Sequence, residues 1–182
     1  VASAPAASTT AAVPTADTAT TLVAYQWQLK SATDAAGQSI TALFPSPDKP
    51  LGLLFGDGRI NVTGSCNRMS AGYQLLDTVQ LQASPGPSTM MACPPPLADA
   101  DDAIARFLSG TLQVALEGES GAPQLRLAAA NGSTLTFAGT PTPETRFGGP
   151  GTRAFLEVSP EPCVAPAPAT PRCLMVRDRH FD

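Results

Sequence analysis

The chain has 182 residues, the length of one domain with extensions, and a formal net charge of −4. It therefore lacks the basic surface by which proteins bind nucleic acids or anionic membranes, and no run reaches the ~20 apolar residues of a membrane span. Only 5% of residues are aromatic and 14% charged, whereas Pro and Gly number 19 and 15. This composition favours short strands joined by turns over a helical bundle.

The first segment, residues 1–21, consists of Ala, Thr, Ser, Pro and Val with one charge, Asp17. Such a segment cannot bury enough apolar surface to offset the entropy of ordering, so we predict a flexible tether. A cloning leader is the alternative. The chain also opens without a methionine, at Val1, and we expect that a targeting segment has been removed.

Order is predicted from Leu22–Leu29, where Tyr25, Trp27 and Leu29 alternate with glutamines as in a half-buried strand. A weaker strand is expected over residues 37–44. A hairpin follows, formed by 53–55 and 59–63 around a Gly-Asp-Gly turn. Residues 72–83 predict one or two further strands, and the prolines and serines of 84–88 are expected to end them.

One helix is predicted, over residues 97–110. Asp99 or Asp101 is expected to cap its start, and Gly110 to close its end. Ile104, Phe107 and Leu108 recur at i, i+3 and i+4, which predicts one buried face.

A meander is predicted after the helix, with strands over 111–118, 123–130 and 133–139. The second turn contains Asn131-Gly132, a strong hairpin signal. Residues 22–139 are therefore expected to form a mainly β (α+β) domain, a small antiparallel β-barrel-like or strongly curved sheet with one packed α-helix.

Residues 140–152 are rich in Pro and Gly and are predicted to be a linker. Beyond it, residues 153–182 predict two strands that flank a proline-rich loop. Two strands alone are marginally stable in water. We therefore interpret this segment as the beginning of a second, truncated domain, which must pack on the first domain, pair with a partner or be completed by further residues.

The four cysteines allow three readings: a metal site, a nucleophile or disulfides. Structural zinc ligands usually come in close pairs such as C-x2-C, which this chain lacks. A nucleophilic thiol needs a base, and the one histidine, His180, lies almost at the end of the chain. Disulfides are favoured instead, with Cys66 paired to Cys93 and Cys163 to Cys173.

No other catalytic set is apparent in the sequence. No G-x-S-x-G motif and no glycine-rich phosphate-binding motif occurs. The carboxylates of Asp99, Asp101 and Asp102 are better explained by a helix start than by calcium binding or acid–base chemistry. We expect no enzymatic activity, no cofactor and no metal.

The segments together resemble the META domain of the HslJ family of bacterial envelope and heat-shock-associated proteins. The resemblance is carried by "WQL" at 27–29, "GRINVTGSCNRMSAGY" at 58–73, "STMMACP" at 88–94, and the helix and strands as far as residue 139. It implies a small β-barrel-like domain with one helix, exported or lipid-anchored, and no established catalytic activity. Residues 153–182 resemble the start of a small domain of unknown function that often follows META domains.

The matching motif defines a loop that the Cys66–Cys93 disulfide would hold and that is a possible interaction surface. Its residues are Gly64, Asn67, Arg68, Tyr73, Thr89 and Met91. Asn67 is expected to cap the loop, and Arg68 is expected to pair with a carboxylate or carbonyl. For both residues these structural roles are favoured over contact with a ligand. Of Met90 and Met91, one is expected in the core and the other on an apolar surface.

The resemblance implies a function at the bacterial cell envelope, in the periplasm or as an outer-membrane lipoprotein whose lipid anchor preceded Val1. The leading hypothesis is a non-enzymatic module that binds a protein, lipid or small apolar ligand and supports envelope integrity, heat-shock response or novobiocin resistance. The alternative is an inhibitor or secretion-system accessory that presents the disulfide-held loop or a sheet edge to a partner. No nucleic acid partner and no membrane span are expected.

Overall fold

The computed structural model describes residues 15–118, 121–149, 156–161 and 173–178, and it divides into two units, residues 1–147 and 148–182. In the first unit, eight antiparallel strands form a closed barrel, in which each strand pairs with the next and the last pairs with the first. This confirms the expected barrel-like fold. The strands are β1 (Tyr25–Thr33), β2 (Gly52–Gly56), β3 (Arg59–Thr63), β4 (Met69–Leu75), β5 (Gln80–Ser88), β6 (Gly110–Glu117), β7 (Gln124–Ala129) and β8 (Thr134–Pro141).

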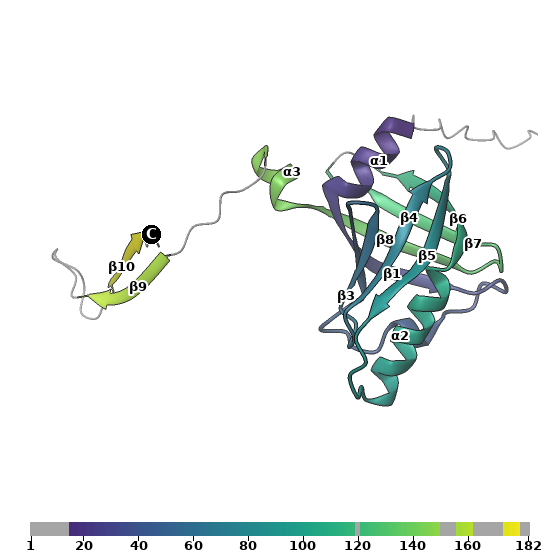
Figure 1. The fold of residues 1–182 in the computed structure, drawn as a ribbon, viewed down its shortest axis with the longest axis horizontal. Helices are drawn as coiled ribbons and strands as arrows, with labels where there is room; N and C mark the ends of the chain where they lie inside the picture. The colour runs from purple at the N-terminus through teal and green to yellow at the C-terminus, as the bar shows by residue number, and fades with distance from the viewer. Residues whose placement is uncertain (1–14, 119–120, 150–155, 162–172, 179–182) are drawn as a thin grey trace, which may run out of the picture. The chain divides into compact units, whose positions relative to one another are not determined.

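Helices accompany both ends of the barrel. Helix α1 (Thr15–Ala24) lies at one end and α2 (Pro95–Phe107) at the other (Figure 1). A 3-10 turn, η1 (Thr41–Leu43), packs against α2, and the short helix α3 (Pro143–Phe147) follows β8. Among these described helices, none has the length and apolarity that crossing a membrane would require.

Side chains fill the barrel interior. Trp27 and Phe137, the two largest buried residues, are 1% and 0% exposed, and Ile104 of α2 is fully buried. No buried polar side-chain atom in the described residues lacks a hydrogen-bond partner. The interior of the barrel is therefore a packed core of side chains.

The predicted hairpins are confirmed, with Gly52 opposite Thr63 across β2–β3 and Leu125 opposite Phe137 across β7–β8. The strand predicted over 37–44 is wrong, because this segment makes one bridge, Thr33–Ser39, before η1. The predicted break at 84–88 is also wrong, since β5 continues to Ser88. The prolines are tolerated there because this part of β5 pairs with β4 but not with β6, which leaves one side free of ladder bonds.

Helix α1 corrects the expectation of a tether over residues 1–21, of which residues 1–14 lie outside the described part. Its Leu22 is fully buried, and the Leu22 carbonyl accepts a hydrogen bond from Trp27 Nε1 at 2.9 Å. Thr18 donates from Oγ1 to the Thr78 carbonyl at 3.3 Å. The helix is stabilised by this tertiary packing, which cannot be predicted from the composition of the segment.

Helix α2 has the predicted buried face, with Ile104 and Phe107 buried, and Leu108, the residue after the helix, is buried as well. Its start was predicted wrongly, because the helix begins at Pro95, whose fixed φ and missing N–H suit a first turn. Asp99 and Asp101 therefore lie inside the helix, and neither caps it. The helix ends at Phe107, and Gly110, with φ of 100°, begins β6.

The segment 140–152 is not a linker throughout, since β8 extends to Pro141 and α3 follows it.

In the second unit, β9 (Leu156–Glu161) and β10 (Cys173–Asp178) form the two predicted strands as an antiparallel pair, with Val158 opposite Val176. Cys163 and the side chain of Cys173 lie outside the described residues, so their pairing stays a prediction.

Candidate functional site

A disulfide joins Cys66, in the β3–β4 connection, to Cys93, just before α2, with Cα atoms 6.2 Å apart. The predicted pairing is therefore present. It fixes the β3–β4 loop against the segment 89–93, which links β5 to α2. Two chain segments that are distant in the sequence are thereby held together at the α2 end of the barrel.

The carboxylate of Asp101 lies beneath this disulfide and is 6% exposed. It accepts hydrogen bonds from the backbone N–H of Cys66 at 3.1 Å and of Asn67 at 2.8 Å. Asn67 Nδ2 donates a third bond at 3.0 Å. Asp101 thus satisfies the loop's buried donors, and the expected role in capping a helix is replaced by one in holding the loop on α2.

Asn67 connects both sides of the site, as its predicted role in loop architecture requires. Its Oδ1 accepts hydrogen bonds from Met91 N at 2.7 Å and from Thr89 Oγ1 at 3.0 Å. Its Nδ2 also donates to Cys93 Sγ at 3.3 Å. One amide side chain therefore ties the β3–β4 loop to the segment that carries Met91.

Arg68 takes part through its backbone, which exchanges hydrogen bonds with Thr89: Arg68 N donates to Thr89 Oγ1, and Thr89 N donates to the Arg68 carbonyl, each at 3.0 Å. Its side chain is exposed. Within the described ranges, the guanidinium makes neither of the predicted contacts, a carboxylate or a carbonyl. Its charge faces solvent beside the loop.

Cys66, Cys93 and Asp101 place two sulfurs and a carboxylate oxygen within 4.8 Å of one another, the spacing of a metal site. The donor set does not fit one. Metal ligation by cysteine uses the thiolate, and both sulfurs here are joined to each other. The carboxylate already accepts three hydrogen bonds.

Gly64, the first residue after β3, and Tyr73, in β4, support the motif. Gly64 has φ of 79°, and a Cβ at this position would overlap the Pro50 carbonyl, so glycine meets both the backbone and the packing requirement. Tyr73 packs edge-to-face on Phe55 with ring centroids 5.2 Å apart. Burial, and to a smaller extent the charge of Asp57, raises the pKa of the Tyr73 hydroxyl.

Replacing Asp57 by Asn should lower the pKa of Tyr73 toward its ordinary value without restoring it, because the burial contribution remains. Asn tolerates the positive φ of residue 57, 49°, so the turn should be preserved. The pKa of Tyr73 is raised in the folded state, so the folded protein keeps its full stability below the unfolded pKa of about 10. As pH rises from there through the folded-state pKa, the protein loses the part of its stability that comes from this shift. Ultraviolet titration of phenolate absorbance measures the shift, with Tyr73→Phe identifying the signal.

Met90 and Met91 correct a prediction, since neither is in the core. Met90 is 98% exposed and Met91 is 57% exposed. They flank an open groove of about 520 Å³, whose other lining residues include Met69, Ala105 and Asp102. The motif therefore places two flexible apolar side chains in solvent, on a backbone that Asn67 and the disulfide hold in place.

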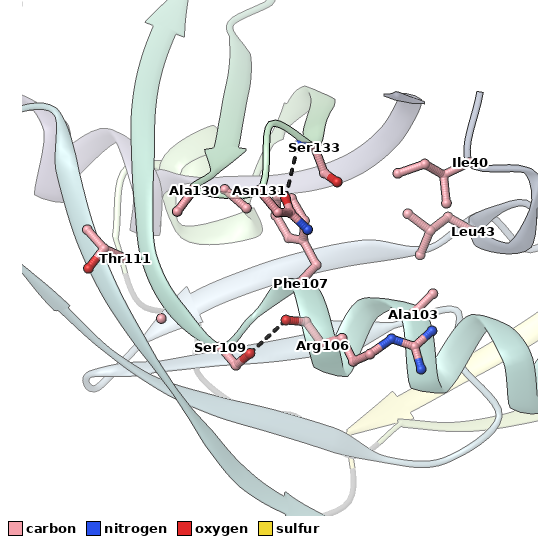
Figure 2. Close-up of a pocket in the computed structure, with 12 residues that line it drawn as sticks. Ile40, Leu43, Ala103, Arg106, Phe107, Ser109, Thr111, Ala130, Asn131 and Ser133 are labelled. Carbon is pink, nitrogen blue, oxygen red and sulfur yellow. Dashed lines mark hydrogen bonds between the residues drawn. The ribbon is translucent and has the colours of Figure 1, made fainter. Parts of the chain in front are cut away.

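A second cavity, of about 420 Å³, lies at the same end of the barrel (Figure 2). Three segments contribute to it: η1 and the residue before it, with Leu43 and Ile40, the end of α2 with Arg106 and Phe107, and the β7–β8 turn with Asn131. The sequence indicated the helix end and the Asn-Gly turn separately. The helix end and the turn lie close together because the barrel closes, and local sequence patterns do not predict this closure.

Two comparisons place the chain among known proteins. The META domain family model matches residues 20–142. A solved protein from Burkholderia xenovorans, determined by NMR, is similar in fold, with a TM-score of 0.56 and 24% sequence identity, over 77% of this chain and 99% of that chain. Among curated proteins, none matches the chain.

Proposed function

Because the chain belongs to the META domain family, which is associated with bacterial envelope proteins, we propose that it is a non-enzymatic binding module of the envelope. Its binding surface is the Met surface, defined as Met90 and Met91 with the groove that they flank. The partner is a protein that inserts an apolar side chain there. In this role the protein acts in the periplasm, as an outer-membrane lipoprotein, and supports envelope integrity under heat or novobiocin stress.

One observation carries the proposal: the most exposed large apolar side chain among the described residues, Met90, lies on a covalently held segment. Exposed apolar groups on ordered backbone are typical of interaction sites. Methionine adapts its shape to a partner, while the fixed backbone reduces the entropy lost on binding. Neither methionine side chain is needed to fill the core.

The composition of the two cavities supports a binding role over a catalytic one. Their lining residues include no histidine, cysteine or lysine. The acidic residues of the groove are Asp101, which is engaged with the loop, and Asp102, which is exposed. A nucleophile with an adjacent base, the arrangement that covalent catalysis requires, is not among them.

Substituting both methionines, Met90→Ser with Met91→Ser, should weaken partner binding at least tenfold and leave the melting temperature unchanged. A photo-crosslinking residue at position 90 first captures the partner in envelope extracts, and calorimetry with the purified partner then measures affinity. The matched control is Leu76→Ser with Val79→Ser, which removes apolar side chains 52% and 41% exposed near the β4–β5 turn. Equal loss of affinity in both variants, or no loss in the first, would contradict the proposal.

The alternative role, inhibition of a partner, uses the same Met surface, because the disulfide holds the segment that presents it. The two roles differ in their effect on the partner. If the captured protein is an enzyme or a secretion component, its activity should fall on titration with the wild-type chain and stay constant with the Met90→Ser, Met91→Ser variant. If the activity of the partner does not change with the wild-type chain, inhibition is ruled out and the binding role is retained.

A further inference from the structure

The cavity of Figure 2 has two chemically distinct parts. Its apolar part is formed by Ile40 and Leu43 on one side and by Ala103 and Phe107 of α2 on the other. Leu43 and Phe107 are 2% and 8% exposed, so they belong to the core and fix the cavity in position, while the half-buried Ile40 and Ala103 supply its accessible apolar surface. Apolar walls of this kind bind the hydrocarbon body of a small ligand.

The polar part of the cavity offers donors. Arg106 is the one charged residue among those that line it, and it stands in the last turn of α2. In the described part of the chain its guanidinium has no ion-pair partner, although Asp102 lies one helical turn earlier. In a chain of net charge −4, this cavity thus presents an isolated positive charge.

The neighbouring polar groups are oriented by hydrogen bonds, and one of these leaves a donor free. Asn131 Oδ1 accepts a hydrogen bond from Ser133 N at 3.0 Å, which assigns its oxygen and leaves the Nδ2 amide for a ligand. Ser109 donates from Oγ to the Arg106 carbonyl at 2.7 Å, which anchors the residue after the helix end (Figure 2). With no carboxylate in the lining, the available groups favour an anion.

From this arrangement we propose that the cavity binds a small amphiphile with one carboxylate head, of the class of medium-chain fatty acids. The carboxylate pairs with the Arg106 guanidinium, and the hydrocarbon body packs between η1 and α2. A volume of about 420 Å³ falls within the range of small-molecule sites. The residues of this cavity and of the Met surface groove do not overlap, so this site is separate from the proposed partner site.

Calorimetric titration of the full chain with decanoate, below its micelle concentration, and with decanol tests the proposal. We expect decanoate to bind more tightly than decanol, and Arg106→Gln to weaken decanoate about tenfold while leaving decanol unchanged. Arg126→Gln is the matched control, because Arg126 is also an exposed arginine but does not line the cavity. It should leave both affinities as they are.

Amide chemical shifts place the site independently, and perturbations by decanoate should centre on residues 106–111 and 129–133. A second variant, Ala103→Leu, fills the apolar part and should weaken both ligands. Equal binding of decanoate and decanol, an unchanged affinity in Arg106→Gln, shifts centred elsewhere, or no binding would each overturn the proposal. None of these results depends on the Met surface, which is tested separately with its protein partner.

Discussion

Replacing both Cys66 and Cys93 by alanine should lower the free energy of unfolding by about 3.5 kcal/mol. The disulfide closes a loop with a sequence separation of 27, and loop-closure entropy in the unfolded chain gives this magnitude. The variant also loses the hydrogen bond from Asn67 Nδ2 to Cys93 Sγ. Urea unfolding at 25 °C, followed by the fluorescence of buried Trp27, measures the change.

A matched variant replaces the other two cysteines, Cys163 and Cys173, which belong to the second unit. Its barrel transition should coincide with that of the wild type. Non-reducing peptide mapping of the wild type should recover Cys66 linked to Cys93. An unaltered urea midpoint in the Cys66→Ala, Cys93→Ala protein would show that the bond contributes nothing to barrel stability.

Asp101→Ala is the second substitution with a large expected effect, a loss of about 3 kcal/mol in the free energy of unfolding. Three N–H donors from Cys66 and Asn67 lose their acceptor at once, and unsatisfied donors in a partly buried position are costly. The loop should also become mobile, so the amide of Met91, which Asn67 holds, should exchange faster with solvent.

Asp102→Ala is the control for this substitution, because Asp102 is the next residue on α2 and is exposed. It should change stability by less than about 0.5 kcal/mol. Combining Asp101→Ala with the double cysteine variant should cost less than the sum of the separate losses, since all three residues hold the same loop. Strict additivity would mean that Asp101 and the disulfide act independently.

Much of the fold could be predicted because local patterns determine it. The alternation of Tyr25, Trp27 and Leu29 has its counterpart in the burial of β1, and the turns at Gly58 and Gly132 have the positive φ of predicted hairpin turns. Helix α2 was visible from the spacing of its apolar residues. These features depend on residues close in the sequence, so the sequence pattern reports them directly.

Features that depend on distant residues were not predictable in this way. Helix α1 is stabilised by Leu22 in the core and by a bond from Thr18 to Thr78, 60 residues away. Asp101 looked like a helix cap because its partners, Cys66 and Asn67, lie 35 and 34 positions earlier. In each case a long-range contact overrides the local preference.

The candidate sites also differ in how far their features could be predicted from the sequence. The chemistry of the cysteines predicted the disulfide, and the motif predicted the architectural role of Asn67, whose partners Thr89 and Met91 also lie in the motif. The exposure of both methionines was not predictable, because it depends on hydrogen bonds that join residues 89 and 91 to Arg68 and Asn67, far away in the sequence. The cavity beside Arg106 needs η1, α2 and the β7–β8 turn together, so only the folded structure brings it into view.

The pairing of β1 with β8 has a consequence for how the molecule reaches this state. Tyr25 pairs with Pro141, so the barrel closes only when the first and last strands meet across nearly the whole unit. Such non-local pairing makes folding slow, and until it forms both strands expose unpaired backbone. Cys66 and Cys93 both lie between these strands, so the covalent bond can shorten the search before closure. Oxidation would then accelerate folding as well as stabilise its product.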